Sequence, residues 1–290
     1  MVKVISDSTC DLSQELLDRY DVDIIPLHIV MGDKEYRDRL EITPEEIYAW
    51  SDANNTTPKT SAASIEDAIA AFRPYIEAGR EIVAFTISGS MSTTVNVFKM
   101  AAEELEAADK IKVIDSANLS TGIGLQVIEA AIMAKEGKGG SEIEEKILEL
   151  QPKVRASFVV DSLEYLRRGG RCSSVVALAG NVLKLHPRIV VMDGAMSADK
   201  KYRGKYRNIL LNYAKDMEDN LIKARADRVF ITHSGCKDED VRMIKEYLDG
   251  LGVFKEILVT RAGGVISSHC GPSTLGVLYI LGEGADVNGF

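Results

Sequence analysis

A unit of short apolar strand, polar loop and amphipathic helix recurs along the first half of the chain. The apolar runs are VKVIS, EIVAFTI and KIKVIDS, and helices are expected to follow them from near residues 12, 93 and 121. Such an alternation predicts parallel strands that are joined by right-handed crossovers and covered by helices. The sequence therefore favours the α/β class.

A glycine-rich segment, EGKGGS at residues 136–141, interrupts this pattern. The helix EIEEKILELQ and the strand VRASFVV follow it, and a second set of strands and helices includes one long helix expected from about 205 to 225. The length of 290 residues exceeds that of one average domain. We predict two α/β domains, residues 1–153 and 154–290, of which the first has a mostly parallel Rossmann-like sheet.

The charge and the cysteines narrow the possible partners. A formal net charge of −9 and a pI near 5.1 disfavour nucleic acid and anionic membrane surfaces as partners. The four cysteines are far apart in sequence, so we expect neither a metal site nor a disulfide framework. The sequence has no apolar run long enough to span a bilayer, and MVKVISDSTC does not read as a signal peptide, so we expect a cytoplasmic protein without stable membrane insertion.

Three segments rich in serine and threonine mark the candidate ligand site, residues 7–9, 58–64 and 88–94. In doubly wound sheets, ligands bind beyond the carboxyl ends of the strands. Hydroxyl groups beside a helix N-terminus suit an anion, because unpaired N–H groups and a partial positive charge gather there. Helix capping is the alternative, and it explains Ser64 well, while Ser92 could also be a cap. A single cap needs a single hydroxyl, so Thr60 and Ser88 stay candidates for ligand binding.

Two further side chains stand in glycine-rich surroundings. Arg171 lies just beyond the paired glycines that end LEYLRRGGR, and a guanidinium there suits a carboxylate or a phosphate. His269 lies in GGVISSHCGP, and a hydrogen-bonding role is the more economical interpretation. In an extended segment His269 and Cys270 would point to opposite sides, which disfavours a Cys/His nucleophilic pair.

Familiar catalytic and cofactor motifs do not occur in the sequence. The segment Gly122-Ile123-Gly124 lacks the third glycine of a dinucleotide fingerprint, and there is no Walker A sequence, nucleophile elbow or HExxH. We therefore expect no cofactor, and the sequence carries no motif of a self-sufficient enzyme.

Taken together and in order, the motifs resemble those of the DegV family of fatty-acid-binding proteins. They are DSTCDLS, IIPLHIV, PKTS, IS followed by MST, VIDS, LEYLRRGGR and GVISSHCGP. The resemblance implies two α/β domains with a ligand site between or within them that holds a long-chain fatty acid, with its carboxylate near the hydroxyl loops and its tail in an apolar tunnel. It also implies a role as the acyl-binding subunit of a bacterial fatty acid kinase, in which an ATP-dependent kinase subunit forms an acyl phosphate for phospholipid synthesis.

The resemblance also implies roles for individual residues. Thr60 and Ser61 correspond to the hydroxyls of PKTS, and His269 to the family's glycine-flanked histidine. Arg171 matches the arginine after the double glycine and would stabilise phosphate charge. Arg203 lies where the family often has a basic residue that faces the partner.

The sequence departs from the family at one expected carboxylate contact. The family commonly has a pair of serines at positions 88 and 89, and the second is Gly89 here. The Gly89 backbone N–H, or the hydroxyl of Ser88, Ser90 or Ser92, could supply the contact. The predicted ligand-binding set is Thr60, Ser61, Ser88, Gly89, Ser92 and His269.

Two other functions remain open at this point. One is a stand-alone hydrolase or transferase that uses a serine and His269 on a small carboxylated metabolite. The other is a lipid carrier without a kinase partner, which would keep the pocket but would not need Arg171 or Arg203.

Overall fold

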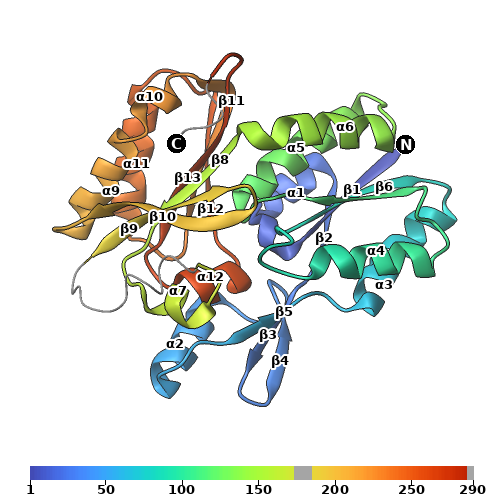
Figure 1. The fold of residues 1–290 in the computed structure, drawn as a ribbon, viewed down its shortest axis with the longest axis horizontal. Coiled ribbons are helices and arrows are strands. Elements are labelled where there is room, and N and C mark those ends of the chain that lie inside the picture. The colour runs from blue at the N-terminus through green and yellow to red at the C-terminus, as the bar shows by residue number, and fades with distance from the viewer. Residues whose placement is uncertain (173–184, 286–290) are drawn as a thin grey trace.

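Three β-sheets organise the part of the chain that the structure describes, residues 1–172 and 185–285 of this computed structural model (Figure 1). The strands are β1 Val2–Asp7, β2 Val22–Ile25, β3 His28–Met31, β4 Lys34–Arg37, β5 Lys59–Ser61, β6 Glu81–Thr86, β7 Ile111–Asp115, β8 Val154–Val159, β9 His186–Met192, β10 Ala195–Tyr202, β11 Ala224–His233, β12 Glu256–Arg261 and β13 Leu275–Leu281. The α-helices are α1 Gln14–Tyr20, α2 Pro44–Asn54, α3 Ile65–Glu77, α4 Thr94–Glu104, α5 Thr121–Lys135, α6 Gly140–Leu150, α7 Glu164–Gly169, α9 Tyr206–Lys215, α10 Glu218–Leu221, α11 Asp238–Gly250 and α12 Gly264–Cys270. Short 3₁₀ helices span Ser8–Cys10 and Gln151–Lys153.

The first sheet is the predicted parallel sheet, with strand order β2-β1-β6-β7. Successive residues of a strand point to opposite faces, so Val83 and Phe85 of β6 join the core under α5, whereas Ile82 and Ala84 join the core under α3 and α4. The chain order reverses between β1 and β6. The carboxyl ends of these two strands therefore form the crevice where a doubly wound sheet binds its ligand.

The second sheet has six strands in the order β10-β9-β8-β13-β11-β12, and only β11 and β12 run parallel. Helices α9 and α11 cover one face, where Tyr213 and Leu248 are fully buried. Helix α5 packs against β8 and β13 as well as against β1, so it lies between the two sheets (Figure 1). The α/β class with a parallel first sheet is confirmed, and the division between residues 153 and 154, which coincides with the start of β8, stays a prediction.

The helix expected from about 205 to 225 is wrong in length. Helix α9 ends at Lys215, α10 covers only Glu218–Leu221, and β11 already begins at Ala224. The helix breaks at Asp216 and Met217, whose side chains are fixed by contacts with other elements. The Asp216 carboxylate accepts a hydrogen bond from Tyr202 of β10, and Met217 is fully buried. These contacts end α9 at a point where the sequence pattern alone predicts that the helix continues.

A small antiparallel sheet, β4-β3-β5, was not expected from the sequence. Its strand β5 places Thr60 opposite Ile29 of β3, so Thr60 belongs to a strand and not to a loop. A strand of three residues carries too little alternation to be recognised as such. This sheet packs against α12, the helix that carries His269.

Candidate functional site

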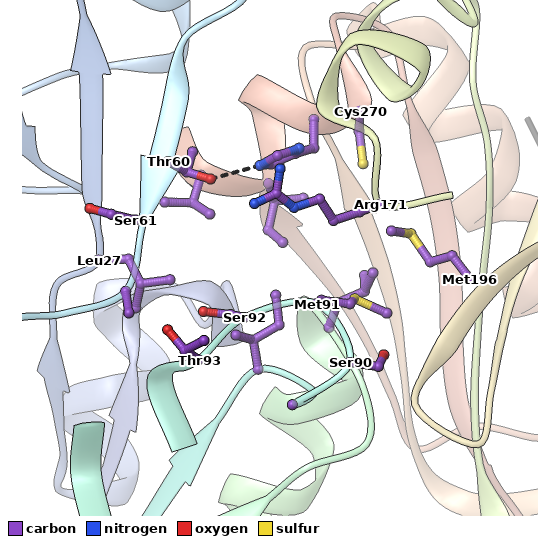
Figure 2. Close-up of a pocket in the computed structure, with 17 residues that line it drawn as sticks. Leu27, Thr60, Ser61, Ser90, Met91, Ser92, Thr93, Arg171, Met196 and Cys270 are labelled. Carbon is purple, nitrogen blue, oxygen red and sulfur yellow. Dashed lines mark hydrogen bonds between the residues drawn. The ribbon is translucent and has the colours of Figure 1, made fainter. Parts of the chain in front are cut away.

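A cavity lined by most of the predicted site residues, here called the main cavity, lies among β5, α12 and the loop after β6, at the carboxyl end of the parallel sheet (Figure 2). Its volume is about 380 Å³, within the usual range for small-ligand pockets. Most of its wall is apolar. The lining residues are Leu27, Thr60, Ser61, Ala62, Ile87, Gly89, Ser90, Met91, Ser92, Thr93, Leu119, Arg171, Met196, Val265, Ile266, His269 and Cys270.

Two of the predicted residues meet directly in the wall of this cavity. The Oγ1 atom of Thr60 lies 2.8 Å from Nε2 of His269, and Figure 2 marks this hydrogen bond by a dashed line. Thr60 comes from β5 and His269 from α12. The segment around His269 is therefore helical, so the geometry considered for an extended chain does not apply.

The His269 side chain is half-buried in the wall of the cavity. Burial, together with the nearby Arg171 guanidinium, lowers the pKa of His269 to about 4, so the ring is neutral at pH 7. Its Nδ1 atom is buried and has no hydrogen-bond partner in the described part of the chain. That atom faces Gly169, where an added Cβ would come within 2.4 Å of it. The first of the paired glycines thus gives the ring its space.

Arg171 places a positive charge at the rim of the cavity. Its side chain is exposed, and Nη1 donates a 2.7 Å hydrogen bond to the carbonyl oxygen of Gly169. In Figure 2 the guanidinium extends towards the Thr60 and His269 pair from the opposite side. The structure thus brings the arginine after the double glycine next to the glycine-flanked histidine.

Ser61 and Ser92 line the cavity with different orientations. The Ser61 hydroxyl is turned away from Thr60, as expected for neighbours on a strand (Figure 2). The Ser92 hydroxyl lies 2.8 Å from Oγ1 of Thr94 and accepts a 3.3 Å hydrogen bond from the Thr94 backbone N–H at the start of α4. Ser64 has the capping role expected of it, because its Oγ accepts a hydrogen bond from the Asp67 backbone N–H.

The polar groups of Ser88 and Gly89 are already engaged elsewhere. The Ser88 hydroxyl is buried and donates a 2.7 Å hydrogen bond to the carbonyl oxygen of Gly194, and Ser88 is not among the lining residues. The Gly89 N–H donates a 3.0 Å hydrogen bond to Oδ2 of Asp115. Ser90, which the predicted set omitted, lines the cavity and also donates to Gly194.

The remaining sequence predictions concern Arg203, metal binding and membrane-spanning helices. Arg203 is exposed just after β10 and is not a lining residue. Within residues 1–172 and 185–285, no group of three His, Cys, Asp or Glu side chains is placed to hold a metal ion. In the same part of the chain, every helix is too short or too polar to cross a membrane.

Sequence reasoning missed most of the apolar wall and a set of buried acids behind it. Leu27, Met196 and Ile266 come from segments far apart in the chain, so no local pattern connects them. Asp11 and Asp38 are almost fully buried and bind the start of α12. Asp11 belongs to the motif DSTCDLS, and an acid beside several hydroxyl residues was the one feature of the sequence that pointed to it.

Comparisons with known proteins find relatives over nearly the whole chain. A family model described as "Uncharacterised protein, DegV family" matches residues 1–282. A DegV domain-containing protein of Clostridium perfringens is 31% identical, with 96% of this chain and 98% of that protein covered. A fatty-acid-binding DegV family protein from Thermus thermophilus has a similar structure, with a TM-score of 0.86, 31% identity and coverage of 97% and 99% of the two chains. A stearic acid-binding protein from Eubacterium ventriosum is similar with a TM-score of 0.83, 29% identity and coverage of 97% and 98%.

Proposed function

The chain belongs to the DegV family, and from this membership we propose that it binds a long-chain fatty acid in the main cavity. The observation that carries the proposal is the Thr60 and His269 pair, which opens into a cavity with mostly apolar walls. Two similar proteins of known structure are described as binding fatty acids, one of them stearic acid. The carboxylate lies at Thr60 and His269, and the tail lies along the apolar wall.

Burial of the tail provides most of the binding free energy. About fifteen methylenes at roughly 0.8 kcal/mol each contribute on the order of 12 kcal/mol, before the cost of ordering the chain is subtracted. A second small cavity, of about 30 Å³, shares Leu119, Ile266 and Cys270 with the main one. These three side chains are therefore suited to contact the part of the tail far from the carboxylate.

The polar groups of the site offset the desolvation of the carboxylate. A hydrogen on Nδ1 of His269 would be buried without an acceptor, so we assign the ring hydrogen to Nε2. Nε2 then donates to Oγ1 of Thr60, and the Thr60 hydroxyl keeps its own hydrogen for the carboxylate. Ser92 is a second donor, and Arg171 supplies positive charge at the rim.

We further propose that the bound fatty acid is presented to a separate ATP-dependent kinase subunit. A carboxylate oxygen would attack the terminal phosphorus of ATP while the bond from that phosphorus to the bridging oxygen breaks, which yields an acyl phosphate and ADP. Arg171, exposed at the rim, is suited to stabilise charge on the transferred phosphoryl group. Exposed Arg203 is available to contact the partner.

A stand-alone hydrolase has less support. A general base works best when its pKa is near the operating pH, whereas the pKa of His269 is about 4. A nucleophile's base is also commonly oriented by a third group, and Nδ1 of His269 has no such partner among the described residues.

Extraction of the purified protein with organic solvent, followed by mass spectrometry, tests fatty acid binding. A co-purified fatty acid in a ratio near one per chain is expected. A consistently empty protein that also fails to take up palmitate contradicts the proposal. Incubation of the loaded protein with a bacterial fatty acid kinase subunit and ATP tests the second step, and an absence of acyl phosphate would favour a carrier without a kinase partner.

A further inference from the structure

The helix that carries His269 begins on two buried carboxylates. The Gly263 N–H donates a 2.8 Å hydrogen bond to Oδ1 of Asp11, and the Gly264 N–H donates a 2.8 Å hydrogen bond to Oδ1 of Asp38. Asp11 follows β1 and Asp38 follows β4, so residues from three distant parts of the sequence meet here. The side chains of both acids are at most 1% exposed.

Each carboxylate uses its second oxygen to bind a hydroxyl from another segment. Oδ2 of Asp11 accepts a 2.6 Å hydrogen bond from Ser120, at the start of α5. Oδ2 of Asp38 accepts a 2.7 Å hydrogen bond from Ser8, whose oxygen accepts a 3.1 Å hydrogen bond from the Leu27 backbone N–H. Both acids therefore link α12 to elements around the parallel sheet.

The contact between Asp38 and α12 leaves no room for a side chain at Gly264. A Cβ atom there would lie 2.9 Å from Oδ1 of Asp38 and 2.7 Å from Cδ1 of Ile29. His269 is five residues further on, a rise of roughly 7.5 Å along the helix. A movement of the first turn would therefore be carried to the His269 ring.

We propose that Asp11 and Asp38 are positioning residues that fix the first turn of α12 and thereby hold His269 against Thr60. A carboxylate suits this task because its two oxygens accept from the helix and from a neighbouring segment at once. The consequence for ligand binding rests on the proposed function, whereas the position of the ring does not. Loss of either acid loosens the head-group site while the apolar wall stays in place.

NMR of the His269 ring tests this without a ligand. The wild-type ring is expected to show one neutral tautomer and a pKa far below 6.5. In Asp38→Ala, and in Asp11→Ala, release of the first turn should raise the pKa of His269 by at least one unit and mix the tautomers. Burial and the Arg171 guanidinium are what lower the pKa of His269, and neither acid contributes to that shift, so a rise in the acid variants reports movement of the ring.

Milder and matched variants complete the experiment. If the alanine variants of the acids do not fold, Ser8→Ala and Ser120→Ala test the same point, because they remove the hydroxyls that bind the second oxygen of Asp38 and of Asp11. These variants should also raise the pKa of His269, by less than the loss of an acid. Asp7→Ala is the control, because this acid is equally buried but binds Thr9 and Ile87 rather than α12. It should leave the His269 signals unchanged.

Ligand binding provides the second readout, with palmitate and hexadecanol as probes. The preference for palmitate over hexadecanol is expected to fall about tenfold in Asp38→Ala, while the affinity for hexadecanol changes little. If the His269 signals of folded Asp38→Ala and Ser8→Ala match those of the wild type, the positioning role is overturned. If wild-type protein binds neither probe, the proposed function fails while the NMR result still stands.

Discussion

Oγ1 of Thr60 and Nε2 of His269 lie 2.8 Å apart although 209 residues separate them in the sequence. The contact joins the small antiparallel sheet to α12, and it lies in the wall of the main cavity. A hydroxyl that accepts from a neutral histidine keeps its own hydrogen for a carboxylate, so the site needs no buried positive charge. This relationship determines which substitutions should affect the head group and which should affect the tail.

Replacement of Thr60 by valine should weaken binding of a fatty acid and spare a ligand with an uncharged head. Thr60→Val keeps the shape but removes the hydroxyl that we assign to the carboxylate. A hydrogen bond to a charged group is worth about 1.5–3 kcal/mol, so the affinity for palmitate should fall roughly 10- to 150-fold. Calorimetry with palmitate and methyl palmitate measures the difference.

Thr56→Val is the matched control, because Thr56 is exposed and is not a lining residue. It should bind both ligands as the wild type does. Equal loss of palmitate and methyl palmitate affinity in Thr60→Val would show that Thr60 acts through packing, against a role in carboxylate binding.

The paired glycines before Arg171 should respond differently to alanine. In Gly169→Ala, the new Cβ would lie 2.4 Å from Nδ1 of His269, so the ring must leave its present position against Thr60. Gly170 has a φ of 68° and open space around its Cβ position. Gly170→Ala should therefore cost about 1 kcal/mol of stability from backbone strain and leave the ring in place.

Crystal structures and urea unfolding of both variants measure these effects. Gly169→Ala should bind palmitate at least tenfold more weakly, whereas Gly170→Ala should bind it as the wild type does after correction for the unfolded fraction. An unmoved His269 ring in Gly169→Ala would contradict the close approach.

Local patterns predicted the parallel sheet and the residues of the site better than they predicted the contacts within it. The alternation of apolar runs and amphipathic helices is a local signal, and it located β1, β6, β7 and the helices after them. The Thr60 and His269 contact depends on how distant elements pack, which no sequence spacing encodes. The resemblance to a family named both residues, but only the fold shows that they touch.

The loop after β6 shows that residue type alone does not identify the side chains that face a cavity. The sequence predicts Ser88 and Gly89 as ligand contacts. In the fold, Gly89 lines the cavity while its N–H binds Asp115, and the Ser88 hydroxyl binds the Gly194 carbonyl. A hydroxyl that points at a cavity and one that holds a neighbouring turn look alike in sequence. The apolar wall was equally hidden, because Leu27 and Met196 come to the same cavity only in the folded chain.

Gly89 should resist conversion to the serine that is common in the family. A Cβ there would lie 2.7 Å from Oδ2 of Asp115, a carboxylate that the backbone N–H groups of Gly89 and Ala117 hold in place. Gly89→Ser should therefore displace the carboxylate and lower stability by about 1 kcal/mol. In an Asp115→Ala background the same substitution should cost clearly less, because the obstacle is gone.

Urea unfolding of the wild type, the two single variants and the double variant forms a double-mutant cycle. A coupling energy of at least 0.5 kcal/mol is expected between positions 89 and 115. Additive losses would show that Asp115 does not restrict position 89.

Acidification should raise the stability of the fold through its buried acids. Burial raises the pKa of Asp11 to about 7 and that of Asp7 to about 6, so the folded state binds more protons than the unfolded state from pH 7 down to about 4. Each acid therefore adds stability as the pH falls through its folded pKa. His269 acts in the opposite direction, because its lowered pKa favours the neutral ring and costs stability between about pH 6.5 and 4. Burial also raises the pKa of Asp38, which acts with the two acids, and lowers the pKa of His233, which acts with His269. With three acids against two histidines, the net stability should rise modestly between pH 7 and 5.

Asp11→Asn isolates the contribution of one acid, because the amide oxygen can still accept from Gly263 while the titration is lost. Between pH 5 and 7 the removed contribution is on the order of 2 kcal/mol. The free energy of unfolding of Asp11→Asn should thus decrease on acidification, or stay level, where that of the wild type increases. Urea unfolding at pH 5, 6 and 7 measures both slopes, with exposed Asp52→Asn as the control that keeps the wild-type slope. Identical slopes in wild type and Asp11→Asn would mean that Asp11 stays ionised in the fold at pH 5, in which case its two hydrogen bonds outweigh the cost of burying its charge.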